Sequence, residues 1–242
     1  MRLAAAAALA ALLLPATAPA QPAAHDMQPV DSFRIDRTEV TIGQFRRFAQ
    51  ATGLVTAAEK AGGGFQFRAG WERMAGWTWQ APFGRPGAGD EPAVHVTWHE
   101  AQAYCRWAGL RLPTDAEWAR AAFTETRADP PAPFARGRAY PYPTGDSPDG
   151  ANQLDQPKGT LAKELGRGAG HVAVRTTQPG VNGLWDMGAN VWEWVDHETG
   201  AGKRTRGSSW WYGAAAMRAD NLAEKPADFP AVYIGFRCAA GG

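Results

Sequence analysis

The chain contains only two cysteines, Cys105 and Cys238, which lie in the middle and near the end of its 242 residues. Two thiols allow a single intramolecular pairing, and that disulfide would tie the centre of the chain to its C-terminal part. On the chain-entropy model, closing so long a loop stabilises a fold by about 4–5 kcal/mol. If the two thiols pair, no cysteine is left as a nucleophile, a redox centre or a soft metal ligand.

The N-terminal residues are typical of a secretory signal peptide. Arg2 is followed by an Ala/Leu run as far as Leu14 and by a small-residue stretch that ends at Ala20. We expect cleavage after Ala20, or alternatively after Ala24, so that the mature chain is periplasmic or secreted, where disulfides persist. The apolar run is shorter than the roughly 20 residues of a membrane-spanning helix. We therefore expect no membrane span after cleavage; an uncleaved anchor is the alternative.

Composition limits the class of protein. The net charge is +1 and no stripe of Lys or Arg is present, which argues against nucleic acid and anionic membrane surfaces as partners. The 28 glycines, 18 prolines and 11 tryptophans favour a loop-rich domain held by large aromatic side chains. We predict a signal peptide over residues 1–20, a flexible segment over 21–29 and one domain over 30–242.

Three helix starts carry the same signature. Thr41–Gln44, Thr97–Glu100 and Thr114–Glu117 each place a threonine three residues before Gln or Glu. This spacing predicts a capping box, in which the two side chains satisfy free backbone donors at the start of a helix. We therefore predict helices directly after residues 41, 97 and 114.

A long segment rich in Gly and Trp lies between the first two predicted helices, over residues 62–90. A loop of this length inside a compact domain is usually functional or disordered. Trp71, Trp77 and Trp79 lead us to expect that this segment is packed against the domain.

Several motifs occur together in a fixed order. They are TEVT at 38–41, PAVHVTW at 92–98, LRLPTDAEW at 110–118, GLWDMGANVWEW at 183–194, RGSSW at 206–210 and GFRC at 235–238. Together they resemble the formylglycine-generating enzyme, or sulfatase-modifying factor, family over about residues 30 to 240. The resemblance implies an α+β, C-type-lectin-like fold that is loop-rich, with few short helices and small antiparallel sheets. It also implies that Cys105 and Cys238 form a structural disulfide.

Members of the family that make formylglycine bind copper with a second cysteine pair, because soft thiolates suit Cu(I). In a register without gaps, Tyr212 and Met217 stand at those two positions. Neither side chain supplies a thiolate. We therefore expect no copper site and no conversion of cysteine to formylglycine, and the catalytic residues, if any, are unknown.

The family resemblance also implies calcium at the 183–194 loop, since a hard cation takes carboxylate, amide and main-chain oxygens. The predicted ligands are Asp186 and Glu193 through carboxylates and Ala189 and Val191 through carbonyls, with Asn190 as an extra oxygen. In the alternative reading, Asp186 and Glu193 only cap turns. A second, weaker site would use Asn152 and Gln153, but no carboxylate stands near Gly166 and Gly168 to complete it.

A groove is expected around the substituted cysteine positions. Three consecutive aromatic residues, Trp210, Trp211 and Tyr212, cannot all point inward, so at least one should line a surface. Downstream polar residues would form either the floor of a ligand groove or a hydrogen-bonded loop. They are Arg218, Asp220 and Asn221.

Two functions compete. The first is a calcium-stabilised binding or maturation factor for a periplasmic protein or peptide, as expected for a member of this family without the catalytic thiols. The alternative is an oxidoreductase of altered chemistry, of the siderophore-maturation or non-haem-iron type. Iron needs two histidines and a third ligand; the five histidines show no suitable spacing, but clustering in space leaves iron open. His95 and His99 alone are poor evidence for zinc.

Overall fold

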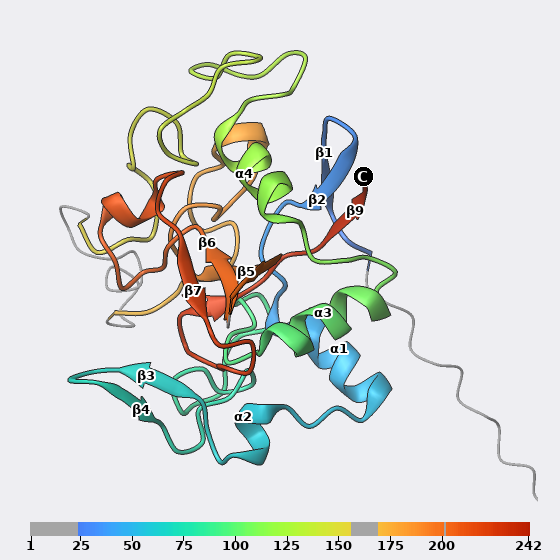
Figure 1. The fold of residues 1–242 in the computed structure, drawn as a ribbon, viewed down its shortest axis with the longest axis vertical. Coiled ribbons are helices and arrows are strands. Elements are labelled where there is room, and N and C mark those ends of the chain that lie inside the picture. Colours follow the sequence, from blue (N-terminus) through green and yellow to red (C-terminus); the bar gives the residue numbers. More distant parts are fainter. Residues whose placement is uncertain (1–23, 156–168, 201) are drawn as a thin grey trace, which may run out of the picture.

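The computed structural model describes residues 24–155, 169–200 and 202–242. The predicted signal peptide lies outside these residues. The described residues contain four helices, two 3-10 turns and nine strands (Figure 1). The helices are α1 (Ile42–Thr52), α2 (Ala57–Lys60), α3 (Trp98–Trp107) and α4 (Asp115–Phe123), with turns η1 (Val181–Gly183) and η2 (Ala214–Met217). The strands are β1 (Met27–Val30), β2 (Phe33–Asp36), β3 (Phe65–Phe67), β4 (Trp71–Arg73), β5 (Trp192–Thr199), β6 (Gly202–Arg206), β7 (Ala223–Lys225), β8 (Ile234–Gly235) and β9 (Ala239–Gly241).

The three predicted helix starts are confirmed. Each threonine accepts a hydrogen bond from the backbone of the Gln or Glu three residues later, and that side chain bonds back to the threonine N–H. A fourth box of the same kind, which was not predicted, is formed by Thr56 and Glu59 at the start of the single turn of α2. Its helix is too short to carry an apolar repeat, so the box was its only signal.

The strands form three small sheets, in the orders β1-β2-β9, β3-β4 and β7-β6-β5-β8. All pairings within these sheets are antiparallel except β5 with β8, which is parallel. The first sheet joins the N-terminal hairpin to the last strand, so the two ends of the described chain lie side by side (Figure 1). The predicted α+β, loop-rich class is confirmed.

Buried tryptophans connect the segments of the core. Trp98 Nε1 donates to the carbonyl of Val195, and Trp194 Nε1 donates to the carbonyl of Val96, both at 2.9 Å. These two bonds hold the start of α3 against β5. Buried tryptophans therefore link segments that are far apart in the sequence, through apolar packing and one N–H hydrogen bond each.

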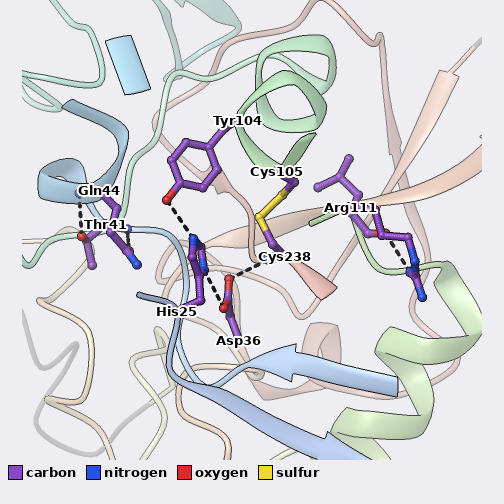
Figure 2. The surroundings of a disulfide bond; sticks show 9 residues. His25, Asp36, Thr41, Gln44, Tyr104, Cys105, Arg111 and Cys238 are labelled. Carbon is purple, nitrogen blue, oxygen red and sulfur yellow. Dashed lines mark hydrogen bonds and ion pairs between the residues drawn. A yellow bond between two sulfur atoms is a disulfide. The ribbon is translucent and has the colours of Figure 1, made fainter. Parts of the chain in front are cut away.

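The N-terminal boundary of the domain differs from the prediction. Residues 21–29 were expected to be a flexible segment, but Met27–Val30 is strand β1, and His25 lies between Asp36 and Tyr104 with its side chain only 6% exposed (Figure 2). The fold thus includes the chain from about residue 24 onward. Among the described residues, no helix has the length and apolar character required to cross a bilayer.

Candidate functional site

The two cysteines form the disulfide that counting and family resemblance both indicated. Cys105 in α3 and Cys238, just before β9, are bonded across 133 residues, with their Cα atoms 5.7 Å apart and both side chains buried. Asp36 accepts a hydrogen bond from the Cys238 N–H and another from His25, so the N-terminal segment packs beside the bridge (Figure 2). Because the chain has no other cysteine, no thiol is free.

Glu193 lies at the centre of a buried charge pair. Its two oxygens accept from Nε and Nη2 of Arg237, each at 2.7 Å, and Trp118 Nε1 donates to the same carboxylate at 2.7 Å. Arg237 also donates to two main-chain carbonyls and is fully buried. Although burial lowers the pKa of Arg237, the charge and hydrogen bonds of Glu193 raise it overall, so the guanidinium stays charged.

Asp186 is likewise committed to protein groups. Its Oδ1 accepts from the Thr177 hydroxyl at 2.6 Å and its Oδ2 accepts from the Arg175 N–H at 3.2 Å. Burial raises the pKa of Asp186, and the hydrogen bonds from Thr177 and Arg175 only partly oppose this.

These contacts bear on the predicted calcium ligands. Calcium favours carboxylate oxygens that are free to converge on it, whereas every carboxylate oxygen of Asp186 and Glu193 already accepts a hydrogen bond. Among the residues that the structure describes, no group of three or more His, Cys, Asp or Glu side chains is placed to hold a metal. As arranged, Glu193 does not fit a calcium ligand, since Arg237 already neutralises it. Calcium at this loop stays a prediction from the resemblance.

Asn190, predicted as an extra calcium ligand, instead ties distant segments together. Its Nδ2 donates to Glu39 at 2.9 Å, and its Oδ1 accepts from the Val172 N–H at 2.9 Å and from Asn152 at 3.0 Å. Its carbonyl accepts from the Trp210 N–H at 3.0 Å. Ala189 and Asn190 both have positive φ, at 63° and 53°, which aims these groups in different directions. The 183–194 loop therefore positions the start of the 210–212 segment.

Glu39 is the other end of this network and lies fully buried. Its Oε1 bonds to Asn190, while Oε2 has no hydrogen-bond partner within the described part of the chain. Burial, and then the nearby charges of Asp186 and Glu193, raise the pKa of Glu39 well above its usual range. Three carboxyl groups thus share one buried region with a single guanidinium.

The second predicted calcium site also has internal partners. Asn152 Nδ2 donates to Asn190 and to the carbonyl of Gly170, and Gln153 Oε1 accepts from the Asp155 N–H at 2.7 Å. The positions near Gly166 and Gly168, where the acidic partner would fall, lie outside the described residues.

The residues at the substituted cysteine positions pack in different places. Tyr212 is half-buried against the main apolar cluster, and its ring lies 5.5 Å from that of Trp192. Met217 is fully buried in a small separate cluster with Ala151 and Ala189. Neither position offers a thiolate.

The predicted groove residues divide into buried and exposed members. Trp210 is buried and Trp211 is exposed, which confirms that at least one of the three consecutive aromatic residues faces solvent. Downstream, Arg218 and Asp220 are both exposed and approach to only 3.6 Å, and the Asn221 N–H donates to the Arg218 carbonyl. These three therefore form a solvated turn rather than a buried polar floor.

An aromatic surface, missed as a unit in the sequence, lies beside Trp211. Its exposed members are Phe67 at 39%, Trp71 at 42% and Trp211 at 36%. Ring contacts join them through Phe229 and Tyr233: Trp71 lies 4.8 Å from Phe229 and 6.0 Å from Tyr233, and Trp211 lies 6.0 Å from Tyr233. The 62–90 segment is packed against the domain as expected, with Trp79 buried, but Trp71 packs one side of its ring on Phe229 and leaves the rest exposed. We call these five residues the aromatic surface.

Buried polar atoms that lack a hydrogen-bond partner occur in the three residues directly before Trp211 and in Trp192. The hydroxyls of Ser208 and Ser209 and the indole N–H groups of Trp192 and Trp210 are buried and make no hydrogen bond within the described residues. An unsatisfied buried donor costs about 1–3 kcal/mol, so such atoms usually mark water or ligand positions. The RGSSW motif was the signal that could have singled out the two serines.

Within the described ranges, His95 and His99 are not brought together with a third ligand, so the structure adds no support for an iron site there. His95 is buried and its Nε2 bonds to the carbonyl of Pro82 at 3.0 Å, while His99 is exposed at the start of α3. Among the described side chains, no three His, Cys, Asp or Glu residues are placed to hold one metal ion.

Comparisons with known proteins agree with the fold and the motifs. Residues 10–241 match the sulfatase-modifying factor enzyme 1-like domain. The formylglycine-generating enzyme of Thermomonospora curvata is 31% identical over 86% of this chain and 82% of the relative, and the inactive Cα-formylglycine-generating enzyme 2 of Bos taurus is 32% identical over 88% and 78%. The solved structure of PvdO from Pseudomonas aeruginosa has the same fold, with a TM-score of 0.61, 22% identity and coverage of 87% of this chain and 80% of PvdO. This chain belongs to the sulfatase-modifying factor, or formylglycine-generating enzyme, family.

Proposed function

We propose that this chain is an exported binding or maturation factor that holds a protein or peptide client and does not make formylglycine. The observation that carries the proposal is the Cys105–Cys238 disulfide, because it uses both thiols of the chain. Copper-dependent activation of oxygen by a thiolate pair requires side chains that are absent here. The relative from Bos taurus that is named inactive supports a family member without this activity.

The aromatic surface supports binding as the remaining role. Contiguous exposed aromatic side chains are uncommon on a protein surface unless they contact a partner. Here two indoles and a phenyl ring are exposed and backed by the buried Tyr233. The backing ring is fixed, since the Tyr233 hydroxyl accepts from the Phe67 N–H at 3.1 Å and donates to its carbonyl at 3.2 Å. A rigid aromatic surface loses little conformational entropy on binding.

The rest of the fold supports a scaffold that holds this surface in place. The disulfide joins α3 to the C-terminal segment, and the Glu193–Arg237 pair joins the same segment to β5. The surface residue Tyr233 lies only a few positions before Arg237 along the chain. These two links hold the segment that carries the binding face, and calcium at the 183–194 loop, predicted from the family resemblance, would add a further link.

Client capture tests the proposal. The mature chain, immobilised, is exposed to the exported-protein fraction of its source cells, and bound proteins are cross-linked and identified by mass spectrometry. The Trp71→Ala/Trp211→Ala variant should reduce recovery of the client at least about tenfold, the loss expected from two truncated anchors. Val55→Ala is the control, because Val55 is also an exposed apolar side chain but lies between α1 and α2. Equal recovery by the double variant and the control would overturn the proposal.

An enzymatic alternative has a separate readout. Stoichiometric iron or copper in the purified chain, together with oxygen consumption, would favour an oxidoreductase over a binding factor. A peptide that carries the sulfatase cysteine motif should show no conversion to formylglycine by mass spectrometry.

A further inference from the structure

The β3–β4 hairpin is bonded in an alternating pattern that leaves one edge unused. The Met74 N–H donates to the Gly64 carbonyl at 2.9 Å, and near the tip the Arg68 N–H donates to the Gly70 carbonyl at 2.9 Å. In an antiparallel pair, bonded and non-bonded residue pairs alternate. Gln66 and Glu72, paired in register between these two bonds, are therefore the bonded pair. The main-chain groups of Trp71 and Arg73 point away from β3.

The two outer edges of the hairpin differ. On the β3 side, the Phe65 N–H donates to the Pro230 carbonyl, the Phe65 carbonyl accepts from the Val232 N–H, and the Phe67 main chain bonds to the Tyr233 hydroxyl. On the β4 side, the outward N–H and C=O groups of Trp71 and Arg73 meet no partner within the described residues, and all three residues of β4 are exposed. Figure 1 shows the hairpin at the periphery of the molecule, with α2 near its base and its tip pointing outward.

β4 is a short edge strand, and both of its charged side chains make contacts within the hairpin. Natural edges are blunted by proline or by charged side chains that guard the open groups. β4 contains no proline, and the charge of Arg73 is drawn back over the hairpin, with its guanidinium 4.5 Å from the Phe65 ring centre and bonded to the Gly63 carbonyl. Glu72 alternates to the other face of the strand and pairs at 3.9 Å with Arg68. The face that carries Trp71 keeps an exposed indole next to open main-chain groups.

We propose that an extended segment of the client adds to β4 as a further antiparallel or parallel strand, with an apolar side chain of that segment packed on Trp71. This inference rests on the proposed function, because it takes the client to be a polypeptide. Strand addition draws affinity from main-chain hydrogen bonds and specificity from alternate side chains. Trp71 and Arg73 together offer two donors and two acceptors with the two-residue spacing that an extended chain matches. The aromatic surface continues from Trp71 through Tyr233 to Trp211 and offers apolar contacts to the flanking side chains.

The probe is a random heptapeptide library displayed on phage, selected against the full mature chain. A recovered peptide is then synthesised with single N-methyl groups at each position, and its affinity is measured by calorimetry. A strand paired on one side uses alternate amides, so N-methylation should weaken binding about tenfold at every second residue and little in between. Hydrogen exchange followed by NMR should show slower exchange of the Trp71 and Arg73 amides on binding, and no change at Glu72.

Substitutions at one position provide a matched pair. Arg73→Pro removes an outward N–H but no bond of the hairpin, whereas Arg73→Ala keeps that N–H and loses the same side chain. We expect Arg73→Ala to bind the peptide within about threefold of the parent and Arg73→Pro to bind at least about tenfold more weakly. If Arg73→Pro also unfolds the hairpin, the N-methyl series on the parent protein still decides the question.

The outcomes separate this inference from the proposed function. A peptide that loses binding with Trp211→Ala, but shows no two-residue N-methyl pattern and no protection at Trp71 and Arg73, overturns strand addition and leaves a client-binding surface. Failure to recover any peptide overturns the strand-addition proposal, while client capture reports on the function independently. Concentration-dependent dimerisation that protects the same two amides without peptide would show that a second copy of the chain occupies the edge, and would overturn a client strand.

Discussion

Arg237 and Glu193 form a bidentate ion pair, with Nε–Oε2 and Nη2–Oε1 distances of 2.7 Å, in which neither side chain is accessible to solvent. The pair joins the GFRC segment, which ends at the disulfide, to the start of strand β5. Removing one partner of a buried pair leaves an uncompensated charge.

We therefore expect Arg237→Met to lower the free energy of unfolding by about 3–5 kcal/mol, because Glu193 stays buried without its cation. Urea denaturation followed by tryptophan fluorescence measures the loss. Arg120→Met is the control, since Arg120 pairs with Asp31 at 2.7 Å on the exposed surface and should cost no more than about 1 kcal/mol. Equal losses for the two variants would contradict the structural role of the buried pair.

The disulfide should contribute most of its stability through the unfolded chain. Replacing both cysteines by serine is expected to cost about 4–5 kcal/mol, since the bridge closes a loop of 133 residues. Chemical denaturation of the double variant, and of the parent protein after reduction, gives two independent values. Alkylation and mass mapping that found Cys105 or Cys238 free in the native mature protein would contradict the pairing.

Stability should fall as the pH is lowered through the range in which His95 titrates. Burial lowers the pKa of His95 to about 4, with its neighbour His171 acting in the same direction, while an unfolded histidine has a pKa near 6.5. Between pH 4 and pH 6.5 this histidine is protonated in the unfolded chain and neutral in the folded chain. The stability that comes from keeping His95 neutral is therefore fully present above pH 6.5 and is lost as the pH falls toward 4. The slope from this residue is about 1.4 kcal/mol per pH unit at most.

The matched variant for this prediction is His95→Asn. His95 has a φ of 57°, a left-handed conformation that asparagine tolerates better than most residues, and asparagine does not titrate. Denaturation at a series of pH values gives the slope of the unfolding free energy against pH. For the variant this slope should be smaller by the equivalent of about one bound proton. Identical slopes would rule out His95 as the source.

The hydrogen bonds at the 183–194 loop lead us to expect little effect of calcium on the folded chain, in contrast to the calcium site that the family resemblance predicts. Asp186 and Glu193 already accept hydrogen bonds at every carboxylate oxygen, and Arg237 neutralises Glu193. We expect the melting temperature to be the same in EDTA and in millimolar calcium, measured by calorimetry. A cation that binds only the folded chain would stabilise it by about 2.7 kcal/mol at a free concentration of about 100 times its Kd. A calcium-dependent rise in melting temperature that Asp186→Asn abolishes would contradict this expectation and restore the ligands predicted from the motif.

Local signals in the sequence predicted local structure well. The capping boxes at Thr41, Thr97 and Thr114 each act within four residues, so their outcome does not depend on the rest of the fold. The same signature at Thr56 was available and was missed because its helix has only four residues.

Predictions about the candidate site were less complete, because the site depends on distant partners. Asn190 was expected to face a cation, and it instead bonds to Glu39, which is 151 positions away. Trp71 and Trp79 were both expected to pack against the domain, but only Trp79 is buried, while Trp71 stays partly exposed in the same aromatic surface as Trp211. No spacing along the chain distinguishes an indole that packs inward from one that faces solvent.

The amino-acid sequence alone determined the family, the α+β class and the use of both thiols in one bridge, because motif order and a count of two cysteines do not depend on coordinates. Tertiary structure alone decided which polar groups neutralise one another and which edge of the β3–β4 hairpin stays open. The physical reason is that hydrogen bonds and charge pairs between remote segments form only after the backbone has brought them within about 3 Å.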